Sequence, residues 1–192
     1  MSKPNVRDQL ITASLATLHS KGFNATSVQD ITDAAGVPKG SFYNHFASKE
    51  VLGAEVVQHY AEASRRLHGP LTDASLAPLA RLAQYFDGMV QANVDNQFHS
   101  GCLLGNFSTE LSAQSPLIRA QVERAFQQWS DGLAAVISLA QQEGSVASTD
   151  SAAALADAVL QAWQGAVARA RTAHSRAPLD LFRHTTLRKL LQ

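Results

Sequence analysis

Residues 26–49 read TSVQDITDAAGVPKGSFYNHFASK, which contains the capping and helix-breaking residues of two short helices joined by a tight turn. The first helix is expected over about residues 28–35, and two overlapping capping boxes fit its start: Thr26 with Gln29, and Ser27 with Asp30. Gly36 ends this helix, and Pro38 opens a second short helix that reaches about residue 45. Two short helices with a glycine-containing turn predict a helix-turn-helix.

The second short helix is expected to bury one face and expose the other. Phe42 and Phe46 are four residues apart, so both should face the core. The outward stripe is polar and consists of Lys39, Gly40, Ser41, Tyr43, Asn44 and His45. Such side chains suit phosphates and base edges, and glycine allows a close backbone approach. An ordinary helical hairpin with a polar face has the same spacing, so the pattern alone leaves both readings open.

The rest of the chain also favours helices. Helix-forming residues dominate, and alternating strand patterns are nearly absent. Helices are expected near residues 4–21, 48–67, 73–95, 101–112, 115–142, 150–173 and 178–191. The predicted fold is all-α. A three-helix helix-turn-helix DNA-binding domain covers residues 1–50, and a larger helical ligand-binding and dimerisation domain covers 51–192.

Bulk composition says little about the partner but more about the compartment. The 192 residues carry 16 basic and 16 acidic side chains, so net charge gives no reason to expect nucleic acid. A single cysteine cannot form an internal disulfide, which favours a reducing cytoplasm. We find no signal-peptide pattern and no apolar run long enough to span a membrane. A cytoplasmic protein without a membrane partner is expected.

The residues around the turn resemble the TetR family of transcriptional repressors over about residues 5–55, without a gap. The matching positions are Gly22-Phe23, Ala25-Thr26-Ser27-Val28, Asp30-Ile31, Ala35-Gly36-Val37, Lys39-Gly40-Ser41-Phe42-Tyr43, His45-Phe46 and Ser48-Lys49-Glu50-Val51-Leu52. The resemblance implies a homodimer on a near-palindromic operator. It also implies DNA contacts by Thr26, which would cap the first motif helix, and by Ser27, Lys39, Gly40, Ser41, Tyr43, Asn44, His45 and Lys49.

The resemblance further implies that a small-molecule inducer binds inside the second domain and releases the DNA. An apolar or aromatic ligand needs a pocket lined mainly by apolar side chains. The candidates are Phe86, Phe98, His99, Cys102, Phe107, Phe126, Trp129 and Trp163. The alternative is that most of these side chains simply form the core, because pocket and core share this composition.

Cys102 is the sharpest single feature of the second half. It falls near a helix start, which favours the thiolate, and His99 lies three residues before it. A reactive thiol here would let an electrophile or oxidant release the DNA. The GCL segment at residues 101–103 also resembles a TetR subgroup, some members of which sense electrophiles. The alternative is a small buried hydrophobic residue.

The last two helices are the expected dimer interface. Apolar and small residues recur there at intervals of three and four, and the resemblance implies a four-helix bundle across a two-fold axis. The predicted interface residues are Leu155, Val159, Ala162, Trp163, Ala166, Phe182 and Leu187. Packing of this stripe within one subunit is the alternative, but it would leave one of two apolar helix faces exposed.

Two other functions compete with the repressor. An enzyme is disfavoured because no hydrolase, phosphate-loop or paired-cysteine metal motif is present, and we expect neither a metal nor a cofactor. A DNA-bound scaffold regulated by a protein partner would expose apolar patches, which the many polar and small residues outside the terminal helices argue against. Activation in place of repression stays open, because operator position decides it.

Overall fold

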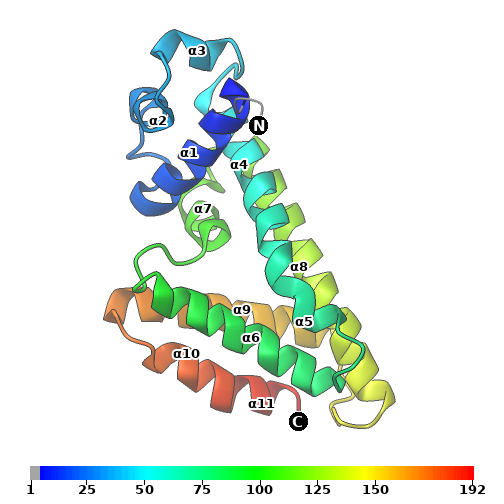
Figure 1. Ribbon diagram of the computed structural model, residues 1–192. Helices are drawn as coiled ribbons and strands as arrows, with labels where there is room; N and C mark the ends of the chain where they lie inside the picture. Colours follow the sequence, from blue (N-terminus) through cyan, green and yellow to red (C-terminus); the bar gives the residue numbers. More distant parts are fainter. Residues whose placement is uncertain (1–4) are drawn as a thin grey trace. The chain divides into compact units, whose positions relative to one another are not determined.

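The computed structural model describes residues 5–192, so the predicted helix start at Pro4 lies outside the described residues. Within that range the chain is helical, with no strand, as the sequence predicts (Figure 1). No helix of the described part is long and apolar enough to cross a membrane. The elements are α1 (Val6–Lys21), α2 (Val28–Ala35), α3 (Lys39–Tyr43), α4 (Lys49–Ser64), η1 (Arg65–His68), α5 (Gly69–Thr72), α6 (Pro78–Asp95), α7 (Leu103–Leu111), α8 (Pro116–Gln142), α9 (Ala152–Ala173), α10 (Ala177–Leu181), η2 (Phe182–Thr186) and α11 (Leu187–Leu190).

The chain divides into two compact units. One comprises Met1–Ala63 with Cys102–Ala125, and the other comprises Ser64–Gly101 with Phe126–Gln192. The predicted DNA-binding domain, residues 1–50, falls inside the first unit, which also contains α7 and the first part of α8. The domain boundary expected after residue 50 stays a prediction.

The first unit is built around the packing of α1 against α2, α3 and α4. Its fully buried side chains include Leu10, Leu18, Ile31, Phe42 and Leu52. An ion pair between Arg7 and Glu55 joins α1 to α4, and the Arg7 guanidinium lies 5.3 Å from the centre of the Phe46 ring. These contacts join α1 to α4 and to the residues that follow α3.

The second unit centres on three aromatic rings from three helical segments. Trp163 of α9 lies 5.4 Å from Phe86 of α6 and 5.2 Å from Phe182 of η2, between ring centres. Phe86 and Phe182 are 4.9 Å apart, and none of the three is more than 1% exposed. Arg183 pairs with Asp87 at 2.7 Å on the outside of this cluster. The rings therefore join α6, α9 and η2. The three segments lie side by side in the second unit (Figure 1).

The helix expected to begin near residue 73 starts five residues later. Asp73 accepts hydrogen bonds from the backbone N–H of Ser75, at 2.9 Å, and from its hydroxyl, at 2.6 Å. An aspartate that bonds two residues ahead favours a turn over a helix. Pro78 then opens α6, because proline tolerates a first helical turn. Asp73 is the turn signal that helix periodicity alone overlooks.

Candidate nucleic-acid interface

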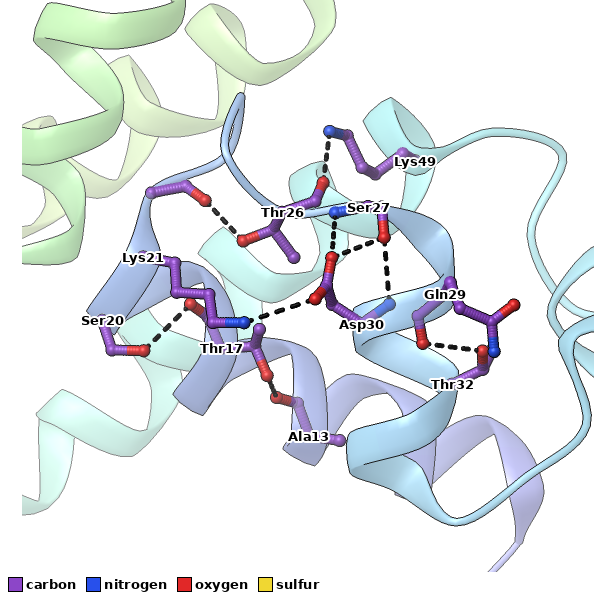
Figure 2. Close-up of polar contacts among 11 residues, drawn as sticks. Ala13, Thr17, Ser20, Lys21, Thr26, Ser27, Gln29, Asp30, Thr32 and Lys49 are labelled. Atoms are coloured by element: carbon purple, nitrogen blue, oxygen red, sulfur yellow. Dashed lines mark hydrogen bonds and ion pairs between the residues drawn. The ribbon is translucent and has the colours of Figure 1, made fainter.

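The first helix of the motif begins at a complete capping box. The Ser27 hydroxyl accepts a hydrogen bond from the backbone N–H of Asp30 at 3.1 Å. The Asp30 carboxylate in return accepts from the Ser27 N–H at 2.8 Å (Figure 2). Of the two boxes that fit the sequence, the structure therefore contains the second. The cap that the family resemblance assigns to Thr26 is wrong, because Ser27 is the N-cap of α2 and Thr26 lies one residue before it.

Asp30 also ties this helix to the end of α1. Hydrogen bonds from the Ser27 hydroxyl and N–H, followed by one from Lys21, lower the pKa of Asp30 to about 2. Lys21 Nζ lies 3.3 Å from the carboxylate (Figure 2). A carboxylate that accepts several hydrogen bonds favours its charged form, so Asp30 stays ionised near neutral pH.

A sharp turn at Gly36 separates α2 from α3. Gly36 has φ +66°, a left-handed conformation that glycine adopts without the clash of a Cβ atom. Its N–H bonds the carbonyl of Asp33 at 3.1 Å, and the N–H of Val37 bonds that of Thr32 at 3.0 Å. The chain then enters α3 through Pro38, in the order that the sequence predicts.

The short helix α3 exposes the predicted polar stripe. Phe42 is fully buried and Phe46 is 1% exposed, which confirms their core positions. Tyr43, between them, is 59% exposed. Ser27, Lys39, Gly40, Asn44 and His45 are also exposed, and Ser41 is half-buried. The helix ends at Tyr43, two residues earlier than expected, so Asn44 and His45 lie in the turn that follows.

Thr26 and Lys49 have partners inside the protein. Thr26 is 1% exposed, and its hydroxyl donates to the carbonyl of Gly22 at 2.6 Å. Lys49 Nζ donates to the carbonyl of Thr26 at 2.7 Å (Figure 2). It also donates to the carbonyl of Phe23 at 2.9 Å. Burial lowers the pKa of Lys49, and the nearby charge of Glu110 opposes that shift. Both residues stabilise the segment before α2, and their predicted phosphate contacts stay predictions.

Two family models match most of the chain. Residues 10–56 match the model described as bacterial regulatory proteins of the tetR family, and residues 78–186 match a tetracyclin repressor-like C-terminal domain. The chain belongs to the TetR family of transcriptional repressors.

Individual TetR-family relatives align over nearly the whole chain. DhaR of Mycobacterium sp. strain GP1, an HTH-type transcriptional repressor, is 39% identical over 192 residues, which is 100% of this chain and 95% of DhaR. The transcriptional regulator AcuR of Cereibacter sphaeroides is 34% identical over 92% of this chain and 81% of AcuR. The crystal structure of a regulatory protein TetR from Rhodobacter sphaeroides has a TM-score of 0.89 at 34% identity, covering 95% of this chain and 97% of that one.

The residues predicted to line the inducer site of this TetR-family protein are divided between the two units. Six lie in the second unit: Phe86, Phe98, His99, Phe126, Trp129 and Trp163. Phe86 and Trp163 are fully buried and Trp129 is 8% exposed, whereas Phe98 and Phe126 are half-buried and His99 is exposed. The indole N–H groups of Trp129 and Trp163 are buried and have no hydrogen-bond partner among the described residues. Inducer contact stays a prediction for each.

Cys102 and Phe107 belong to the first unit. Cys102 is the residue that precedes α7, as expected, and is 7% exposed. The hydroxyl of Tyr60 lies 3.9 Å from its Sγ atom. Phe107 is 1% exposed and packs edge-to-face on Phe23 at 5.9 Å between ring centres. Phe107 thus contacts the segment that leads into the helix-turn-helix.

A groove of about 500 Å³ opens on the second unit. It contains none of the predicted inducer residues, and its lining mixes apolar side chains with three basic ones. The lining residues are Leu79, Leu82, Ala83, Ser145, Arg183, His184, Leu187, Arg188, Leu191 and Gln192. Among the described residues, no group of three or more histidine, cysteine or acidic side chains could hold a metal ion.

Most residues of the predicted dimer stripe pack within one TetR-family protomer. Leu155, Val159, Trp163, Ala166, Phe182 and Leu187 are each at most 9% exposed in the single chain, and Ala162 is half-buried. These side chains can contribute little further burial to a second copy. Dimerisation through α9 and the C-terminal helices stays a prediction, and the remaining exposed side of these helices is the surface available for it.

Proposed function

We propose that this TetR-family repressor binds a near-palindromic operator as a homodimer, in the cytoplasm, and that a small molecule releases it. The observation that carries the proposal is the exposed polar face of α3, supported from beneath by Phe42 and Phe46. Two such faces in a dimer would sit roughly 34–36 Å apart, one turn of DNA. Lys39, Ser41 and Tyr43 are the principal candidates for contacts in the major groove.

Tyr43→Ala is expected to weaken operator binding without unfolding the protein. Its ring is 59% exposed, so its removal leaves no cavity, whereas a lost groove contact costs roughly 10- to 100-fold in affinity. Operator DNA would be selected from a random pool with the wild type, and its dissociation constant measured for both proteins. Leu117→Ala is the matched control, because Leu117 is 44% exposed on α8 in the same unit. Equal affinities for wild type and Tyr43→Ala would contradict the proposed face.

The inducer is expected to be apolar or aromatic with a hydrogen-bond acceptor. Phe86 and Trp163 supply apolar surface in the second unit. The indole N–H groups of Trp129 and Trp163 are buried there and have no hydrogen-bond partner among the described residues. Buried donors without partners are rare, and a ligand oxygen or a water can satisfy them. These two observations favour an inducer that carries a hydrogen-bond acceptor.

An electrophile acting on Cys102 is the second candidate signal. Cys102 is the residue that precedes α7, and its Sγ atom lies 3.9 Å from the hydroxyl of Tyr60 on α4, so a bulky adduct would push these two side chains apart. N-ethylmaleimide is a suitable probe: the thiolate sulfur bonds to one alkene carbon, and the other alkene carbon takes up a proton. An effective signal should weaken operator binding by about 100-fold or more.

The matched variant for this test is Cys102→Ser. If maleimide releases the wild type from operator DNA and leaves the variant bound, Cys102 is the sensor. If both proteins stay bound, the thiol is part of the core, and a reversible ligand in the second unit becomes the leading candidate.

A further inference from the structure

A carboxylate from α7 binds the segment that leads into the helix-turn-helix. Glu110 Oε2 accepts a hydrogen bond from the backbone N–H of Phe23 at 3.0 Å, and Glu110 Oε1 accepts one from Asn24 at 2.5 Å. The contact joins residues 87 and 86 positions apart in the chain. Hydrogen bonds from backbone N–H groups to an ionised carboxylate are stronger than neutral ones.

Lys49 binds the same segment through its carbonyl groups. Its ammonium donates to the carbonyls of Phe23 and Thr26 and lies 4.2 Å from the centre of the Phe23 ring. Two side chains of opposite charge therefore bind residues 23–26: Glu110 accepts from two N–H groups at the start, and Lys49 donates to the first and last carbonyls. The negative charge of Glu110 opposes the lowering of the Lys49 pKa by burial, as expected for opposite charges on one segment.

The approach of Glu110 is close and is reinforced by packing. A Cβ atom on Gly22 would lie 3.2 Å from Glu110 Oε2, so this position leaves little room for a side chain. Phe107, three residues before Glu110, packs edge-to-face on Phe23. Phe23 is 6% exposed whereas Asn24 is exposed, so the hydrogen bond from the Phe23 N–H is the better shielded of the two. The carboxylate thus satisfies a backbone donor that would otherwise lose its partner.

Residues 23–26 lead directly into Ser27, the N-cap of α2, so their conformation determines where the first motif helix begins. We propose that Glu110 is a positioning residue for operator recognition: it fixes residues 23–26 and, through them, the orientation of α2 and α3 on DNA. Glu110 makes no DNA contact in this scheme. Its loss should lower the preference for the operator more than it lowers general affinity for DNA, because phosphate attraction needs less exact placement.

The test compares operator and non-specific DNA for three substitutions of Glu110. Glu110→Gln keeps the shape but offers one acceptor oxygen in place of two, and we expect about a tenfold loss of operator affinity. Glu110→Ala should lose more, and Glu110→Asp, which keeps the charge, should lose less. The affinity for non-specific DNA should change by less than about threefold in each Glu110 variant, because non-specific binding depends on phosphate contacts.

Glu123→Gln is the matched control, since Glu123 is exposed on α8 in the same unit and the charge change is identical. Circular dichroism would establish that each variant is folded. If Glu110→Ala is unfolded, the test rests on Glu110→Gln. Equal losses on both DNAs would indicate general destabilisation and overturn the proposal, as would unchanged operator affinity. A wild type that selects no operator from the pool would instead refute the proposed function.

Discussion

Phe42→Ala is expected to destabilise the first unit by about 3–5 kcal/mol and to abolish operator binding. Phe42 is fully buried and contacts the rings of Tyr43, at 5.2 Å, and Phe46, at 5.7 Å, between centres. Removing it leaves a cavity beneath α3, which has only five residues and cannot hold its shape alone. Urea unfolding followed by circular dichroism would measure the loss.

Phe42→Leu is the control for this cavity. It keeps most of the apolar volume, so we expect a smaller loss of stability and measurable operator binding. The neighbouring Tyr43→Ala variant distinguishes packing beneath α3 from direct contact with DNA. It should weaken operator binding while the free energy of unfolding stays the same. An unfolding midpoint for Phe42→Ala equal to that of the wild type would show that α3 does not depend on this ring.

Trp163→Ala should have a comparable effect in the second unit, again about 3–5 kcal/mol. Trp163 is fully buried between Phe86 and Phe182, so the alanine variant loses the ring contacts of α9 with α6 and with η2. Calorimetry at fixed protein concentration would record the lower melting temperature. A melting temperature within a degree or two of the wild type would mean that the cluster repacks.

Trp163→Phe refines this second prediction. It keeps an aromatic ring in the cluster while removing an indole N–H that has no partner among the described residues. The loss of stability should therefore be well below that of alanine, because no satisfied hydrogen bond is given up. A loss equal to that of Trp163→Ala would indicate that the indole makes a hydrogen bond, to water for example, that stabilises the folded protein.

The helix-turn-helix was predictable because its signals are local. Gly36, Pro38 and the Phe42–Phe46 spacing each constrain the backbone within a few residues, and the structure contains all three features. The outward face of α3 follows from the same spacing. The cap at Ser27 could not be chosen over Thr26 from sequence, because both registers fit and their difference depends on how the preceding segment packs.

The residues missed by sequence analysis depend on contacts between distant parts of the chain. Nothing in the pattern around Glu110 indicates that its carboxylate reaches Phe23, and a lysine at position 49 reads equally well as a phosphate contact or as a buried partner. The aromatic residues of the second half present the same difficulty. Composition identifies Phe86 and Trp163 as apolar, but only the packing shows that they contact each other.

The positions of the tryptophans determine what intrinsic fluorescence can report about this repressor. The chain has two tryptophans, Trp129 and Trp163, and both belong to the second unit. Intrinsic tryptophan emission will therefore follow the environment of α8 and α9 and will not report directly on the helix-turn-helix. A Tyr43→Trp variant would place a third tryptophan on the face proposed to meet DNA. Comparison of its emission with that of the wild type would distinguish operator binding from events in the second unit.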